Sequence, residues 1–213
     1  MTEKISQING GTKTAPALTD LFEREDGSGN SKYSDLAQLC ALMGGRVLIT
    51  ETVTTGSATN VSFASIPATY RDLEVRVRGR GTKTATLVDI RIRFNADTSG
   101  NYDGETQQAN STTNSNFGGV AGTSAYMGNI AAASATANVA DMIEILIADY
   151  RGTTFQKACR YIATLKTGTA VGNLYNEVGS IWWRNTAAIT QIDVFPSSNG
   201  FVDGTVVSLY GSF

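Results

Sequence analysis

The chain has 213 residues, of which 41% are hydrophobic, and its 17 basic and 19 acidic side chains give a formal net charge of −2. This length allows one large domain, or one domain with a small appendage. The near-neutral charge argues against nucleic acid as a partner, because non-specific nucleic-acid affinity comes largely from Lys and Arg side chains that neutralise phosphates. Histidine is absent, which removes the commonest general base and the commonest metal ligand.

Signals for export or membrane insertion are missing from the sequence. No apolar run approaches the ~20 residues that a membrane-spanning helix needs, and the first residues lack the apolar stretch of a secretory signal. Cys40 and Cys159 lie far apart and form no Cys-x-x-Cys motif, so we predict two buried free thiols rather than a disulfide. These features predict a protein that is made and folds in a reducing cytoplasm, without membrane insertion.

Residues 1–45 are predicted to form a separate N-terminal segment. Leu18, Leu21 and Phe22 make a small apolar cluster in polar surroundings, and the polar residues 23–30 that follow are typical of an exposed turn. This apolar area is too small to fold by itself, so the segment is expected to gain order by docking on a neighbouring surface.

The same segment ends in the only clear helix pattern of the chain, SDLAQLCALMGG. Ser34 can cap the first turn and Gly44 can close the end. One face of the expected helix carries the apolar residues Leu36, Leu39, Cys40 and Met43. A helix of about three turns is too short to be stable alone, which again predicts docking.

From Arg46 onward the hydrophobic pattern has a period of two, which is typical of half-buried antiparallel strands. In DLEVRVRGR, Leu73, Val75 and Val77 alternate with charged residues, and DIRIRFN repeats the pattern. Clusters of Gly, Asn, Ser and Thr separate such stretches at regular intervals. The sequence therefore predicts an all-β body, an antiparallel jelly-roll-like β-sandwich over residues 46–213. The long polar stretch 98–123 fits either an extended loop or a hairpin.

The stretch MIEILIADY is apolar on both faces of its expected strand. Ile143, Ile145 and Ile147 point one way, whereas Met142 and Leu146 point the other way. A strand of this kind needs a cover on both sides, because soluble monomers rarely expose a contiguous apolar patch. A second subunit is the expected cover of the second face.

Two adjacent tryptophans, Trp182 and Trp183, point to opposite faces of another expected strand. One is expected in the core, and the other is expected either at a subunit interface, which we favour, or as a stacking platform for a sugar ring. The predicted interface residues are therefore Met142, Leu146, Trp182 and Trp183.

One loop has part of a calcium-binding pattern. Asn95, Asp97, Ser99 and Gly100 have the spacing that opens an EF-hand loop, but Thr106 stands where the closing Glu is required. An Asx-rich turn explains the same residues. We therefore predict no metal site.

Neither the positions of the arginines nor the spacing of the carboxylates predicts a catalytic site. If the two alternating strands pair, one sheet face would carry the charged residues Arg76, Arg78, Arg91, Arg93, Glu74 and Asp89. A solvated face is the favoured interpretation, and a subunit interface with ion pairs is the second. The third interpretation is a patch that binds an anionic ligand. No pair with glycosidase-like spacing stands out among Asp141, Glu144, Asp149, Glu177 and Asp193. We predict no enzyme activity and no cofactor.

The N-terminal stretch ISQINGGTKTAPALTDLFEREDGSGNSKYSDLAQL resembles the N-terminal segment of bacteriophage tail-fibre and related virion proteins. The matching positions are Ile5, Thr19, Asp20, Leu21, Lys32, Leu36 and Leu39. Ile8 stands where the pattern has Leu. The stretches VRVRGR, RIRFNADTSGNY and DYRGTTFQKA, with the ending from WWRNTAAIT to VVSLYGSF, resemble the β-rich body of such proteins.

This resemblance implies a non-enzymatic virion structural protein, assembled in the host bacterial cytoplasm. Residues 1–45 would attach it to other virion proteins of the tail or capsid, and 46–213 would project outward. The anchoring residues would be Ile5, Leu18, Leu21, Phe22, Leu36 and Leu39. The resemblance also implies a homotrimer, with a short tail fibre as the first expectation. The alternatives are a capsid decoration or head-fibre protein and a carbohydrate-binding module, and a host cell-surface glycan is a further candidate partner.

Overall fold

The computed structural model describes residues 23–25, 31–33 and 45–213, and contacts divide the chain into two units, Met1–Gly45 and Arg46–Phe213. In the first unit, β1 (Glu23–Glu25) pairs with β2 (Ser31–Tyr33) in an antiparallel ladder. The turn predicted over 23–30 is therefore wrong for residues 23–25, which are extended. The predicted helix and all six predicted anchoring residues lie outside the described residues.

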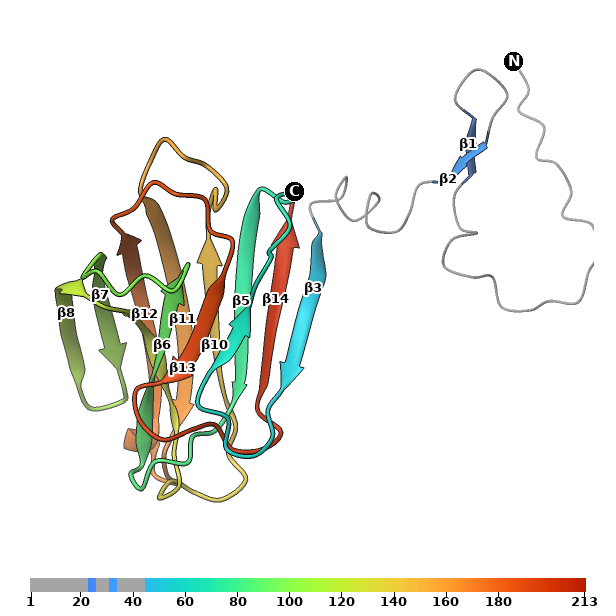
Figure 1. The fold of residues 1–213 in the computed structure, drawn as a ribbon. Coiled ribbons are helices and arrows are strands. Elements are labelled where there is room, and N and C mark those ends of the chain that lie inside the picture. The colour runs from blue at the N-terminus through green and yellow to red at the C-terminus, as the bar shows by residue number, and fades with distance from the viewer. Residues whose placement is uncertain (1–22, 26–30, 34–44) are drawn as a thin grey trace, which may run out of the picture. The chain divides into compact units, whose positions relative to one another are not determined.

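The second unit consists of two antiparallel sheets that share one core, so the predicted all-β sandwich is confirmed (Figure 1). The larger sheet has, in order, β3 (Arg46–Val53), β14 (Val206–Ser212), β5 (Asp72–Gly79), β10 (Asp141–Ile147), β11 (Lys157–Lys166), β12 (Leu174–Trp183), β7 (Tyr102–Ala109) and β8 (Asn114–Gly122). The smaller sheet has β4 (Val61–Phe63), β13 (Ile192–Pro196), β6 (Leu87–Phe94) and β9 (Ala125–Ala131). A short 3₁₀ helix, η2 (Val171–Asn173), precedes β12.

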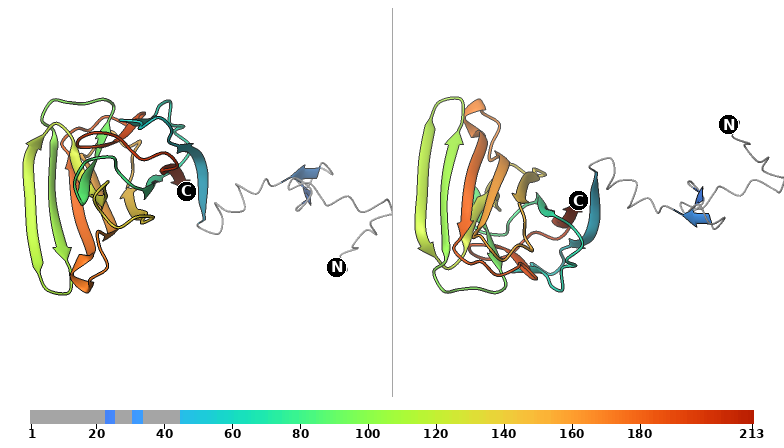
Figure 2. Two further views of the ribbon diagram at one scale, coloured as in Figure 1. Left: turned by 90° about the horizontal axis from the view of Figure 1, so that it is seen from below. Right: turned by 90° about the horizontal axis from the view of Figure 1, so that it is seen from above.

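A jelly roll lies inside this architecture. Eight strands form two facing sheets of order β3-β14-β5-β10 and β4-β13-β6-β9, and the chain alternates between them from β3 to β6 and again from β9 to β14. Two inserted hairpins, β7–β8 and β11–β12, extend the first of these sheets beyond β10. The extension ends in β7 and β8, which Figure 2 shows in yellow-green at the opposite end of the larger sheet from β3.

The core follows from the alternation that the sequence predicted. Leu73, Val75 and Val77 of β5 are fully buried, as are Ile90 and Ile92 of β6. These two strands do not pair, because β5 belongs to the larger sheet and β6 to the smaller one. Their outward arginines therefore lie on two different sheets and form no common face.

The polar stretch 98–123 is resolved as a hairpin, the second of the two structures that the sequence allowed. Its strands β7 and β8 pair with each other, and β7 also pairs with β12. The Asn110 side chain closes the turn, because its Oδ1 accepts hydrogen bonds from the backbone nitrogens of Thr112 (2.9 Å) and Thr113 (2.7 Å). Ladder hydrogen bonds to β12 explain how a sequence with low strand propensity becomes extended here.

Candidate functional site

The outward face of the larger sheet carries the apolar patch that the sequence predicted on β10. Ile143, Ile145 and Ile147 are fully buried, whereas Met142 is 44% exposed and Leu146 is half-buried on the opposite face. The patch is larger than predicted, because the neighbouring strands add two residues. We define the β10–β12 patch by Met142, Leu146, Ile162 and Val178.

The two residues that sequence reasoning missed form the centre of this patch. Ile162 of β11 is 55% exposed and lies directly opposite Val178 of β12, which is 45% exposed. Ile162 is the only aliphatic residue larger than alanine among the outward positions of β11. An apolar residue at one outward position of β11 could have been noticed in the sequence. That Val178 lies beside it follows only from the β11–β12 register.

The adjacent tryptophans have opposite environments. Trp183 is buried among core residues, its indole Nε1 donates a hydrogen bond to Asp97 Oδ2 (2.7 Å), and its ring centroid lies 5.7 Å from that of Phe94. Trp182 is 44% exposed on the outward face. The prediction of Trp183 as an interface residue is therefore wrong, because the core of one subunit already covers it. Trp182 remains available for contact.

Several of the charges beside the β10–β12 patch pair within the subunit. Glu74 accepts from Arg46 Nε and Arg76 Nε, both at 2.7 Å, and Arg76 also lies 3.0 Å from Glu144. The Arg76 guanidinium stacks 5.0 Å from the centroid of the Tyr210 ring. This network places charges of both signs on the outward face.

The calcium-like loop is held by hydrogen bonds within the protein. Asp97 accepts from the backbone nitrogen of Ser99 (2.8 Å), from Asn101 Nδ2 (2.8 Å) and from the indole of Trp183. Burial acts to raise the pKa of Asp97, but these donors outweigh it and hold the pKa well below its ordinary value. The described residues contain no group of three or more acidic or Cys side chains placed to hold a metal ion.

The depressed pKa of Asp97 predicts a pH effect on stability. The charged carboxylate stabilises the fold above the ordinary Asp pKa of about 3.9, and this contribution is lost as the pH falls through the lower folded-state pKa. The difference in free energy of unfolding between wild type and Asp97→Asn should be constant above about pH 5 and should shrink below about pH 4. Urea unfolding at a series of pH values measures it; a difference that grows on acidification would contradict the assignment.

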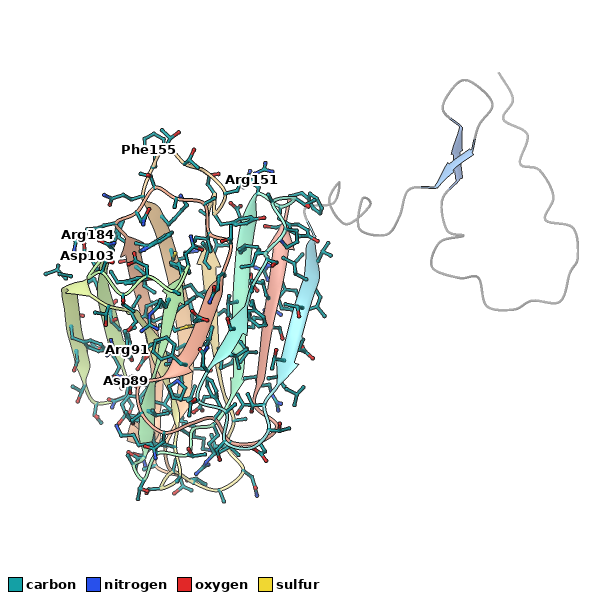
Figure 3. All side chains as sticks on the ribbon, in the orientation of Figure 1. Asp89, Arg91, Asp103, Arg151, Phe155 and Arg184 are labelled. Carbon is teal, nitrogen blue, oxygen red and sulfur yellow. The ribbon has the colours of Figure 1, made fainter. Side chains whose placement is uncertain are left out.

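A second candidate site lies where the inserted hairpin meets the jelly roll. A cavity of about 340 Å³ is bordered by β6, β7, β8 and β9, and we call it the β7–β9 cavity. Its lining includes Asp89, Arg91, Gly104, Phe117, Gly119, Tyr126 and Asn129. Figure 3 shows Asp89 and Arg91 on β6. Its volume lies at the lower end of the ~300–1,000 Å³ range of small-molecule sites.

A buried carboxylate organises one wall of this cavity. Glu177 of β12 is fully buried, and its Oε1 accepts from Gln108 Nε2 (2.6 Å) and Asn129 Nδ2 (2.9 Å). Its Oε2 accepts from the Tyr126 hydroxyl (2.8 Å) and from the backbone nitrogen of Asn129 (3.0 Å). Asn129 Nδ2 also donates to the Tyr126 hydroxyl (2.7 Å). Burial, followed by the charge of Glu177, raises the pKa of Tyr126 far above its ordinary value, so the phenol stays protonated and donates.

A β-bulge brings Tyr126 and Asn129 together. Residues three apart in a regular strand point to opposite faces, but the β6–β9 register shifts between Ile90 and Arg91, which face Gly128 and Tyr126 respectively. Gly128 has φ +126°, and a Cβ there would lie 2.7 Å from the Ala163 Cβ. The bulge therefore depends on glycine, and it directs both side chains to Glu177.

The network leaves one polar atom without a partner. Because the carboxylate of Glu177 only accepts, it fixes the amide of Asn129 with Nδ2 toward Glu177 and Oδ1 away from it. Asn129 Oδ1 is buried and has no hydrogen-bond partner. Such an unsatisfied acceptor costs about 1–3 kcal/mol and calls for an explanation. The sequence analysis considered Glu177 only as one of five carboxylates and did not consider Asn129 or Tyr126.

Within the described part of the chain, no helix has the length and apolar character needed to cross a membrane. A scan against protein-family models and searches of the curated proteins and of the solved structures found no match to this chain.

Proposed function

We propose that this chain is a non-enzymatic bacteriophage virion structural protein, a fibre-like appendage that is attached through residues 1–45 and self-associates as a trimer through its β-sandwich. The resemblance of the N-terminal segment to tail-fibre proteins supports the virion assignment. The β10–β12 patch is the observation that carries the self-association. Its members are Met142, Leu146, Ile162 and Val178, with Trp182 further along β12.

A second copy of the chain is the occupant that the surroundings of the patch favour. The charges beside it are of both signs: Arg76 pairs with Glu74 and Glu144, and the exposed Arg78 and Arg160 lie opposite Met142 and Leu146. A face with charges of both signs can pair its basic and acidic residues with those of a second copy, and the aliphatic residues are then covered on every subunit of a closed ring.

Placing a charge at the centre of the patch tests this assembly. Ile162→Asp should convert the full-length trimer to monomer, because the carboxylate would be buried without a partner in the contact. Sedimentation velocity measures the state directly. The control is Asn116→Asp on β8, an exposed residue opposite Gln107, which should stay trimeric.

A wild-type chain that sediments as a monomer would contradict the self-association. So would an Ile162→Asp variant that stays trimeric. Circular dichroism separates loss of assembly from loss of folding, since Ile162 lies outside the core of its own subunit.

The position on the virion distinguishes a tail fibre from the capsid decoration or head-fibre alternative. Electron microscopy of virions labelled with an antibody against residues 46–213 should place the label at the tail. Label over the capsid faces would favour the decoration protein, and label on no virion would contradict both.

A further inference from the structure

We propose that the β7–β9 cavity binds one ring of a neutral saccharide. The inference does not rest on the proposed virion function, because it is drawn from the walls of the cavity alone. These walls combine a flat floor, two aromatic rings and a set of fixed polar groups, and no subunit contact is needed to complete them.

The floor of the cavity is formed by residues without side chains. Gly104 of β7 lies opposite Gly119 of β8 in the hairpin register, and a Cβ at Gly119 would meet no heavy atom within 4 Å. Two facing glycines leave room for a flat group to lie directly on the sheet. The open space lies over Gly119, whereas a Cβ at Gly104 would lie 3.1 Å from the backbone oxygen of Ser180.

Two aromatic rings stand beside this floor. Phe117, 41% exposed, and Tyr126 pack edge to face with their ring centroids 5.4 Å apart. The ring centroid of Tyr126 lies 6.0 Å from that of Tyr161, and this second edge-to-face contact holds the orientation of the Tyr126 ring. Rigid aromatic rings offer apolar surface to the C–H face of a sugar at a low cost in side-chain entropy.

The polar groups of the cavity match hydroxyl groups. Asn129 Oδ1 is an acceptor without a partner, held in place by the contacts of its amide nitrogen with Glu177 and Tyr126. Asp89 and Arg91, 3.4 Å apart, add an acceptor and a donor on the β6 side. A sugar hydroxyl both donates and accepts, so it can use Asp89 and Arg91 directly, whereas Asn129 Oδ1 is buried and comes within reach only when the side chains around it move.

The charge balance of the site selects a neutral ligand. Arg91 pairs with Asp89, and Asp103, the other carboxylate in the lining, pairs with Arg184 at 3.1 Å. No cation is left over for a phosphate or a carboxylate, whose recognition relies on charged donors. The many backbone and polar atoms of the lining are also unsuited to a lipid chain.

The experiment uses the full-length protein. A printed array of neutral, carboxylated and phosphorylated oligosaccharides identifies a ligand, and isothermal titration calorimetry measures its affinity, with inorganic phosphate as a separate probe. Gly119→Leu should fold, because its side chain meets open space, and should abolish binding by filling the floor. Phe117→Ala should weaken binding about tenfold. The matched control, Asn116→Leu, changes an outward position of the same strand and should bind like wild type.

Binding of a neutral oligosaccharide that is lost in Gly119→Leu and kept in Asn116→Leu supports the proposal. Binding that survives Gly119→Leu would place the ligand elsewhere and overturn it. A preference for carboxylated or phosphorylated glycans or for inorganic phosphate would overturn the neutral class, and no binding to any printed glycan would overturn the site. None of these results depends on whether the protein is trimeric or belongs to a virion.

Discussion

Trp183→Ala is expected to lower the free energy of unfolding by about 3–5 kcal/mol, the usual cost of removing a large buried aromatic side chain. Trp183 is 1% exposed, contacts Phe94 and donates its indole N–H to Asp97. The substitution removes this packing, and it also removes one of the donors that hold the Asp97 carboxylate.

The adjacent tryptophan is the matched control for this substitution. Trp182→Ala should cost less than about 1 kcal/mol, because its ring is 44% exposed in the subunit. Urea unfolding of both variants at the same low protein concentration measures the difference, since assembly then contributes least to stability. Equal losses in the two variants would contradict the assignment of Trp183 to the core and Trp182 to the outward face.

Glu177→Ala should also be strongly destabilising, by about 3–5 kcal/mol. The carboxylate is the shared acceptor of Gln108, Tyr126 and both nitrogens of Asn129. Its removal takes away the acceptor of all four donors, and only the Asn129 amide nitrogen keeps another partner, the Tyr126 hydroxyl. Glu177→Gln should lose less, because the amide keeps one of the two acceptor oxygens although its NH₂ group then faces donors.

The neighbouring exposed residue provides the control for Glu177. Asn176→Ala, on the outward face of β12, should leave the urea midpoint near that of wild type. If Glu177→Ala were no less stable than Asn176→Ala, the carboxylate would not be the organising acceptor of the cavity wall.

The sequence by itself determined which face of each main strand is buried. Strict alternation in β5, β6 and β10 predicted the core positions of Leu73, Ile90 and Ile145, since a side-chain period of two can place apolar groups on only one face. It also determined the outward side of Met142 and the opposite orientations of Trp182 and Trp183, although which tryptophan is inside depended on the fold. The Asx turn at Asp97 was predictable too, because its hydrogen bonds span few residues.

Only the tertiary structure decided which strands are neighbours. Alternation is the same in β5 and β6, so it could not show that Arg76 and Arg91 belong to different sheets. The adjacency of Ile162 and Val178 depends on strand register. The meeting of Tyr126 and Asn129 at Glu177 depends on a bulge and on a partner 48 residues away from Asn129. Pairing between distant segments is set by the packing of the whole sandwich, and a local pattern carries no information about it.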